Sequence, residues 1–452
     1  MSQKQQSEIE ILRFPDNVRK HHGMYILTLN NALEEIVANS VDEVVAGNCN
    51  KIDISIKEDV FTVTDNGSGI PIIPSADPEF NGIPQVEVAM STLHASGKFG
   101  GEKSYNSSTA GQHGVGASCV NALSEEFSVI VKTGGAAYRC DFEKGIIKKH
   151  LYKLKDKVSK EDTGTTVIYR PDYEIWGDEW VDFKAIERRC RQLAYLNPGL
   201  EINLVIDSID DEENPIKAEH HFQYNEGIVG YVKKLTQGKS LIGNVIEIHS
   251  ASKVSIPPGD TDNNKLVDGL GLDIAFAWND SYSNDIKSFV NNVRTVYGGD
   301  HELGFREGLV KAIKRYAVEY KFIKDQKQIE AGDCLEGLTV VLSTRIKDPV
   351  YEGQGKGKLK STQVRGEIRD KVDSEFYDYL CQDSKRSKEF IEKYLKAGKA
   401  RLAAKRARDA ARGLKEVNNV SNVLGKLANC SSKNPDECEV FFVEGKPLNC
   451  PR

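Results

Sequence analysis

The sequence feature that most constrains the fold is a helical segment followed directly by a tight hairpin. Residues 33–45 place leucine and valine at helical spacing along one stripe. Residues 51–57 then alternate strictly between polar and apolar side chains, and a second strand-like run, 60–64, follows after a two-residue acidic turn. A helix that leads into antiparallel strands predicts an α+β layer domain and argues against a doubly wound parallel sheet.

Length, charge and cysteine content exclude several classes of protein. The chain has 452 residues, enough for about two or three domains, and its net charge of -6 argues against a globally basic nucleic-acid coat. No run approaches the roughly 18 apolar residues of a membrane-spanning helix, and the first residues lack an apolar signal core. The nine cysteines are scattered without a CxxC pair. We therefore expect a reduced, cytoplasmic protein without a membrane partner.

Two polar residues of the predicted helix are candidates for catalysis. Glu35 and Asn39 are four residues apart and so share a face, with Asp42 and Glu43 one turn further on. This polar stripe is either the solvated side of an amphipathic helix or part of a site. In the second interpretation Glu35 accepts a proton from an attacking water, and Asn39 supplies a carbonyl oxygen to Mg²⁺.

A short glycine-containing segment, DNGSGIP over residues 65–71, directly follows the second predicted strand. An Asn-Gly pair produces a tight turn in any protein, so the segment is by itself weak support for a site. The functional alternative is an adenine site. Asp65 can accept a hydrogen bond from the exocyclic amine of the base, while Gly67 and Gly69 let the backbone approach the ring.

A third segment, GQHGVG over residues 111–116, ends a stretch rich in Gly, Ser and Thr that has the composition of a lid or binding loop. Glycine-rich turns that enter a helix present N–H groups to a phosphate. The segment is not a dinucleotide fingerprint, because no strand feeds directly into it. It is not a Walker A loop either, because no GK[ST] closes it.

In this order the three segments resemble the motifs of the Bergerat-type (GHKL) ATPases, which include type II topoisomerases, large heat-shock chaperones, MutL-type repair proteins and sensor histidine kinases. Further segments are similar to the B subunits of bacterial DNA gyrase and topoisomerase IV, the type IIA topoisomerases. These segments are residues 18–20, 23–26, 93–99, 112–116, 121–124, 278–280, 291–292, 298–306, 336–339, 348–349 and 354–356. The resemblance covers about residues 9 to 445.

The resemblance implies a Bergerat-type ATPase domain whose mixed sheet is backed by helices, then a ribosomal-protein-S5-like transducer domain and a long C-terminal helix. We expect the ATPase domain over residues 1–215 and the transducer over 216–384. A basic helical linker would span 385–420, and the start of a TOPRIM domain with a divergent tail would span 421–452.

The resemblance also assigns roles to individual residues, with ATP and Mg²⁺ as the ligands. It implies that Glu35 is the catalytic base, that Asn39 is the Mg²⁺ ligand and that Asp65 is the adenine-binding acid. The nucleotide contacts that it implies are Asn39, Glu43, Asp65, Gly69, Ile70, Lys98, Tyr105, Gly111, Gln112, His113, Gly114, Val115, Gly116, Thr165, Gln354 and Lys356. Lys356 would reach the γ-phosphate from the second domain, although the composition of its loop is that of an ordinary surface lysine.

The predicted linker is strongly basic. Residues 385–415 hold twelve Lys or Arg against three acids, which fits either a solvated helix or a surface for DNA phosphates. In the family that it resembles, this stretch lines the cavity that receives duplex DNA. The DNA contacts implied are Lys399, Arg401, Lys405, Arg406 and Arg408.

Several positions depart from the family pattern. The arm before Ile9 lacks a tyrosine, and Gly355 replaces the usual threonine beside Lys356. Residues 439–445 resemble a TOPRIM opening strand with Glu444 as its first acid, but residues 446–452 do not continue the metal-binding pattern. We therefore expect a chain that is split before TOPRIM, or of phage type, rather than a fragment with a foreign tail.

The sequence thus predicts a chain that binds and hydrolyses ATP and dimerises on ATP binding to close a gate on double-stranded DNA. DNA cleavage would come from an A subunit with the cleavage tyrosine and from a separate TOPRIM-containing chain. Two alternatives stay open: a MutL-like repair ATPase, and an ATP-responsive DNA clamp without turnover, in which Glu35 is not used.

Overall fold

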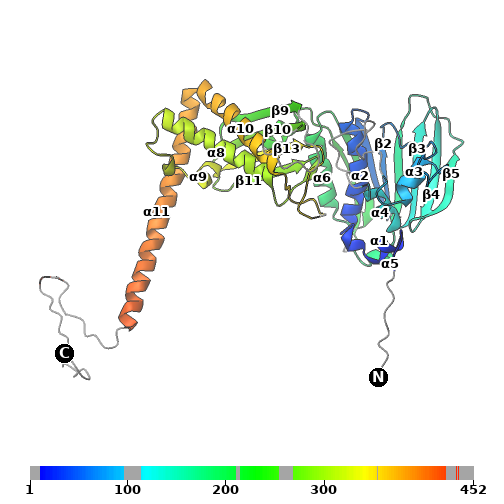
Figure 1. The fold of residues 1–452 in the computed structure, drawn as a ribbon, viewed down its shortest axis with the longest axis horizontal. Coiled ribbons are helices and arrows are strands. Elements are labelled where there is room, and N and C mark those ends of the chain that lie inside the picture. Colours follow the sequence, from blue (N-terminus) through cyan, green and yellow to red (C-terminus); the bar gives the residue numbers. More distant parts are fainter. Residues whose placement is uncertain are drawn as a thin grey trace, which may run out of the picture.

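The computed structural model describes residues 11–95, 114–209, 214–253, 268–353 and 355–423, together with Asn434 and Asp436. These residues form two α+β domains that lie side by side, and a long helix leaves the second domain (Figure 1). The expected fold class is confirmed. No helix among the described residues is long and apolar enough to cross a membrane.

The first domain contains an eight-stranded mixed sheet in the order β5-β4-β3-β6-β2-β1-β7-β8. The pair β1/β7 is parallel and all other neighbours are antiparallel. The strands are β1 (Lys51–Lys57), β2 (Val60–Asp65), β3 (Ser124–Thr133), β4 (Ala136–Glu143), β5 (Ile146–Lys153), β6 (Gly164–Pro171), β7 (Glu201–Ile209) and β8 (Pro215–Phe222). The predicted hairpin is β1 and β2, and its alternation places the isoleucines of β1 in the core.

Helices cover one face of this sheet. They are α1 (Asp16–Lys20), α2 (Leu29–Val45), α3 (Gln85–Ser91), α4 (Gly116–Ala122), α5 (Tyr173–Trp176) and α6 (Phe183–Leu196), with the 3-10 turn η1 (His22–Met24). The predicted helix is α2, which begins at Leu29 because the Thr28 hydroxyl accepts a hydrogen bond from the Asn31 N–H. The predicted stripe at Leu33, Val37 and Val41 is buried in the core.

The expected boundary between residues 215 and 216 needs correction. Strand β8 pairs antiparallel with β7, with Ile206 opposite Ala218, so the first sheet continues to Phe222. The charged side chains near this boundary lie at the end of β7 and the start of the edge strand β8, where Asp207 and Lys217 face solvent and pair with each other. Charged side chains are typical of sheet edges, because they discourage pairing with other strands.

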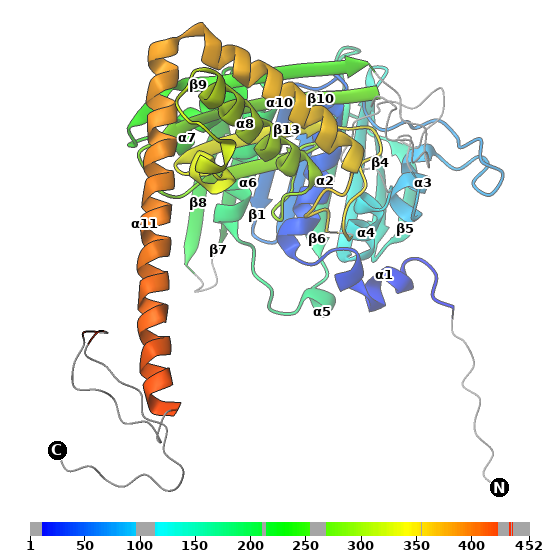
Figure 2. The same cartoon turned by 60° about the vertical axis from the view of Figure 1, so that its left-hand side comes forward.

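The second domain contains a five-stranded sheet in the order β12-β11-β13-β10-β9. Its strands are β9 (Leu241–Lys253), β10 (Asp268–Asn279), β11 (Asp285–Val290), β12 (Val293–Arg294) and β13 (Leu338–Arg345). Its helices are α7 (Gly227–Leu235), α8 (Asp300–Glu319), α9 (Ala331–Leu335), α10 (Thr362–Gln382) and α11 (Ser384–Val423), with the 3-10 turn η2 (Gln326–Gln328). Helices α8 and α10 pack on one face of the sheet, and α7 packs on the other face against α6 (Figure 2).

The basic segment forms helix α11, as expected, but its first turns belong to the second domain. Phe390, Ile391 and Tyr394 are fully buried, and the Phe390 ring lies 5.2 Å from the ring of Trp278. From 402 to 412 every side chain is exposed. The free part of the helix therefore starts near residue 402 and not at 385, because the apolar side chains of its first turns complete the core.

Candidate functional site

The carboxylate of Asp65 lies at the end of β2 and accepts three hydrogen bonds. Oδ2 accepts from the Ser40 hydroxyl at 2.8 Å, and Oδ1 accepts from the backbone N–H groups of Gly67 at 3.0 Å and Thr165 at 3.2 Å. Burial raises the pKa of Asp65, and these three donors act against that rise. The site therefore holds a buried acceptor in a fixed orientation at the edge of the helix layer.

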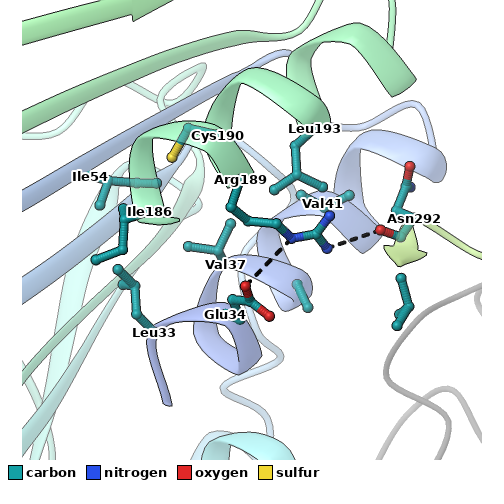
Figure 3. A pocket seen from close by; sticks show the side chains of 12 residues that line it. Leu33, Glu34, Val37, Val41, Ile54, Ile186, Arg189, Cys190, Leu193 and Asn292 are labelled. Atoms are coloured by element: carbon teal, nitrogen blue, oxygen red, sulfur yellow. Dashed lines mark hydrogen bonds and ion pairs between the residues drawn. The ribbon is translucent and has the colours of Figure 1, made fainter. Parts of the chain in front are cut away.

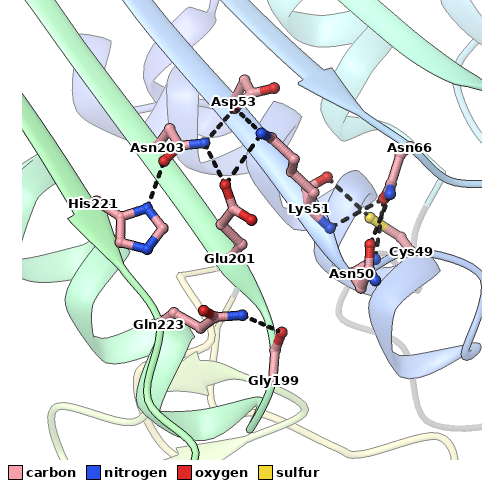
Figure 4. Close-up of polar contacts among 10 residues, drawn as sticks. All are labelled: Cys49, Asn50, Lys51, Asp53, Asn66, Gly199, Glu201, Asn203, His221 and Gln223. Carbon is pink, nitrogen blue, oxygen red and sulfur yellow. Dashed lines mark hydrogen bonds and ion pairs between the residues drawn. The ribbon is translucent and has the colours of Figure 1, made fainter.

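The turn after Asp65 is fixed by its asparagine. The side-chain oxygen of Asn66 accepts hydrogen bonds from the N–H groups of Asn50 and Lys51, and its amide donates to the side chain of Asn50 at 2.7 Å (Figure 4). These contacts tie the end of β2 to the start of β1. The glycines that follow are thus held beside Asp65 and not in a free loop.

Gly69 has a backbone that only glycine adopts readily, and it also lies close to neighbouring strands. Its φ is 80°, and a Cβ atom there would lie 3.0 Å from the Val131 side chain and 3.2 Å from the Lys132 carbonyl. This close approach places the turn directly against β3. Glycine is therefore needed at position 69 for the turn to pack against β3.

Glu43 lies one helical turn beyond Asn39 on α2, and it contacts the glycine-containing turn that follows Asp65. Its carboxylate accepts hydrogen bonds from the backbone N–H of Ser68 at 3.2 Å and from the Ser68 hydroxyl at 3.0 Å. Asn39 is half-buried on the same side of the helix. The polar stripe of α2 is therefore not a solvated helix face, because it packs on the glycine turn.

Glu35 lies at the other end of this stripe, against the start of α4. A Cβ atom at Gly116 would collide with the Glu35 carboxylate, so any larger residue would displace that carboxylate. Gly114 precedes the helix with a φ of 59°. The end of the third glycine-rich segment, at Gly114 and Gly116, thus lies against the part of α2 that carries Glu35.

A lysine from the second domain completes the site. The Lys356 Nζ lies 3.9 Å from Oε1 of Glu35, although the two residues are far apart in the sequence and on different domains. Only 15% of the Lys356 side chain is exposed, which excludes the alternative of an ordinary surface lysine. The carboxylate of Glu35, the amine of Lys356 and the start of α4 therefore lie close together.

A magnesium ion bound with a nucleotide would need few ligands from the protein. Within the described ranges, no group of three or more His, Cys, Asp or Glu side chains could hold a metal ion. Mg²⁺ keeps several waters and binds through few protein oxygens together with substrate phosphates, and the half-buried amide of Asn39 is compatible with that mode of binding.

Comparison with known proteins agrees with this geometry. Residues 25–175 match the family model "Histidine kinase-, DNA gyrase B-, and HSP90-like ATPase", and residues 227–410 match the model "DNA gyrase B". The crystal structure of the 43K ATPase domain of Thermus thermophilus gyrase B has a TM-score of 0.67 and 29% identity, covering 87% of this chain and 97% of that one. The topoisomerase IV ATP-binding domain of Francisella tularensis has a TM-score of 0.64 and 30% identity, covering 86% of this chain and 97% of that one.

The chain belongs to the B-subunit family of type IIA DNA topoisomerases. The DNA gyrase B protein of Staphylococcus aureus is 37% identical over 97% of the chain. The chain spans 65% of the length of that relative. The first domain has the GHKL ATPase fold of this family.

The structure describes only some of the expected nucleotide contacts of this topoisomerase-family chain. It brings together Glu35, Asn39, Glu43, Asp65, Gly69, Ile70, Gly114, Val115, Gly116, Thr165 and Lys356 around the end of β2, helix α2 and the start of α4. The other expected contacts, Lys98, Tyr105, Gly111, Gln112, His113 and Gln354, lie outside the described residues. Glu444 and the expected TOPRIM start also lie outside them.

Two contributors to the site were missed in the sequence. Ser40 orients Asp65, and it could have been found because it lies four residues after Ile36 on a buried helix face, where a polar side chain needs a partner. Arg189 on α6 lies beside α2 and contacts the second domain, and no local pattern marks it.

The expected DNA-binding residues on α11 fall into two groups. Arg401 forms ion pairs with Glu330 and Asp333 at 2.6 and 2.9 Å, so the structure gives it a role in holding α11 against α9. The remaining four residues are exposed: Lys399, Lys405, Arg406 and Arg408. Their charges are available to a partner of opposite charge.

Proposed function

We propose that this chain binds ATP with Mg²⁺, hydrolyses it, and uses it to close a dimeric gate on double-stranded DNA as part of a type IIA topoisomerase. The observation that carries the proposal is the meeting of Glu35 and Lys356 from two domains at the start of α4. A site built from both domains makes their relative position depend on the nucleotide that fills it.

Each described residue has a part in this proposal. Asp65, held by Ser40, accepts the exocyclic amine of adenine. Glu35 orients the attacking water and accepts its proton, as a positioned carboxylate can. Asn39 would hold Mg²⁺, which neutralises phosphate charge when bound. Lys356 neutralises the terminal phosphate, a contact that ADP cannot offer.

The wider assembly belongs to the same proposal. The chain would act in the cytoplasm with an A subunit that carries the cleavage tyrosine. The exposed basic side chains Lys405, Arg406 and Arg408 on α11 would contact DNA phosphates without regard to sequence. Relaxation or supercoiling of plasmid DNA is expected of the complete assembly with an A subunit.

The test is ATP turnover by the purified chain with and without linear duplex DNA. We expect a slow rate that DNA stimulates, that rises more than linearly with protein concentration, and that Glu35→Gln removes. Glu125→Gln, a change at an exposed position of β3, should turn over ATP like the wild type. Nucleotide binding without turnover would refute the hydrolysis part and favour an ATP-responsive clamp.

DNA contact by α11 has its own test. Neutralising Lys405, Arg406 and Arg408 together should weaken DNA binding, and the slope of log K against log salt should fall by about 0.9 for each phosphate that is no longer neutralised. Salt dependence equal to that of the wild type would show that the exposed part of α11 does not contact DNA.

A further inference from the structure

We infer that Arg189 is a positioning residue that clasps the second domain to helix α2 and so sets the approach of Lys356 to Glu35. The inference deepens the proposed function and rests on it, because it concerns the regulation of the same site. The two domains must be held at a defined angle if a lysine from one is to reach a carboxylate on the other.

Arg189 contacts both sides of the domain boundary. Its Nη2 donates a hydrogen bond to the backbone carbonyl of Asn292 at 2.9 Å, and its Nε lies 3.8 Å from the Glu34 carboxylate (Figure 3). Glu34 precedes Glu35 directly on α2. A single guanidinium thus links the second domain to the helix turn that carries the proposed base.

The second-domain side of this link is held by paired hydrogen bonds and leads toward Lys356. Asn291 and Asn292, between β11 and β12, have φ values of 49° and 63°. The Asn291 side chain donates to the carbonyl of Ile346 and accepts from its N–H, both at 2.9 Å. Ile346 follows β13 directly, and the chain from there leads to the loop that carries Lys356. A shift at Asn292 is therefore transmitted to that loop through short, paired hydrogen bonds.

Another set of contacts holds the domains together without Arg189. Tyr195 and Leu196 of α6 pack with Ile228 of α7 and with Val341 of β13 in a buried apolar cluster. This cluster keeps the domains joined, whereas a directional hydrogen bond sets their angle. Loss of Arg189 is therefore expected to change orientation more than stability.

The guanidinium of Arg189 borders a small cavity and has few polar partners among the described residues. A cavity of about 30 Å³ lies beside it between α2, α6 and Asn292 (Figure 3). The Nη1 atom of Arg189 is buried and has no hydrogen-bond partner among the described residues. Among the described residues, the polar contacts that hold the guanidinium are thus the hydrogen bond to Asn292 and the ion pair with Glu34.

The experiment compares Arg189→Ala with Arg188→Ala in ATPase assays. Arg188 is the neighbouring arginine on α6; it is exposed, and within the described part of the chain its side chain pairs with Asp182 alone. We expect Arg189→Ala to lower kcat by about tenfold with KM for ATP within about twofold of the wild type, because misplacement affects turnover and not adenine binding. Arg188→Ala should match the wild type.

A second comparison uses Lys356→Ala as the background. If Arg189 acts through the position of Lys356, adding Arg189→Ala to Lys356→Ala should reduce kcat no further. Effects that multiply, or a loss of ATP binding as large as the loss of turnover, would overturn the inference and leave Arg189 a structural residue.

Hydrogen–deuterium exchange separates failure of the inference from failure of the proposed function. Arg189→Ala should raise amide exchange in residues 291–294 and in the loop after β13, with Arg188→Ala unchanged. This readout does not need turnover, so a wild-type chain that binds ATP without hydrolysing it refutes only the proposed function. Exchange equal to that of the wild type would overturn the clasp whatever the ATPase assay shows.

Discussion

Replacing Asp65 with asparagine should separate nucleotide recognition from folding. In the structure Oδ1 of Asp65 accepts from two backbone N–H groups, and an asparagine oxygen can keep both of these bonds. The new Nδ2 group would face Ser40, whose hydroxyl can turn and accept instead of donating. Because burial raises the pKa of Asp65, a neutral side chain also carries a smaller cost of burial. The variant should therefore fold.

Adenine binding should suffer much more than folding. The exocyclic amine of adenine is a donor, and in Asp65→Asn it would meet another donor. A hydrogen bond to a charged group contributes about 1.5–3 kcal/mol, which corresponds to a rise in Kd for ATP of about 10- to 150-fold. Inosine triphosphate carries a carbonyl in place of that amine, so it should lose less affinity than ATP, or gain some.

The assay is calorimetric titration of both nucleotides, with the thermal unfolding of each variant measured alongside. Asp53→Asn is the matched control, since Asp53 lies on the exposed face of β1 and accepts a hydrogen bond from Asn203 (Figure 4). The control should bind both nucleotides like the wild type. Equal affinity of Asp65→Asn and wild type for ATP, or equal losses for ATP and inosine triphosphate, would refute the assignment of Asp65 to the base.

Three other predictions concern the catalytic contact, pH and the role of α11. Gly116→Ala should lower kcat at least tenfold while the protein stays folded, because the added methyl displaces the Glu35 carboxylate; an unchanged kcat would contradict that contact. Burial lowers the pKa of His301 from 6.5 to about 3, so between these values the unfolded chain binds more protons and the free energy of unfolding should fall by up to about 1.4 kcal/mol per pH unit as pH drops. In urea unfolding, the free energy of unfolding of His301→Gln should depend less steeply on pH than that of the wild type. The same slope in both proteins would refute this explanation. Phe390→Ala should cost about 3–5 kcal/mol in urea unfolding and the exposed Leu402→Ala at most about 0.5 kcal/mol, whereas equal losses would place both residues in the same environment.

The sequence by itself determined the local elements of the site. Helix α2 and the β1/β2 hairpin follow from side-chain periodicity, which depends only on neighbours along the chain. Asp65 and the glycines after it were found because a tight turn after a strand restricts which residues can follow. The resemblance to the topoisomerase B subunits then supplied roles that no pattern could.

Only the tertiary structure decided where the parts meet. The pairing of β8 with β7 moved the end of the first sheet to Phe222, because a charged edge strand looks like a linker until its partner is known. Arg401, expected to contact DNA, instead pairs with Glu330 and Asp333. Isolated charges in a sequence do not reveal whether they face solvent or a partner.

The same holds for the contacts between the domains. Lys356 approaches Glu35, and Arg189 bridges Glu34 and Asn292, across long separations in the sequence. Local periodicity determines which residues form a helix or strand, since each turn or pleat repeats over a few residues. The distance between two domains is set by the packing of many distant side chains at once, so it exists only in the folded chain.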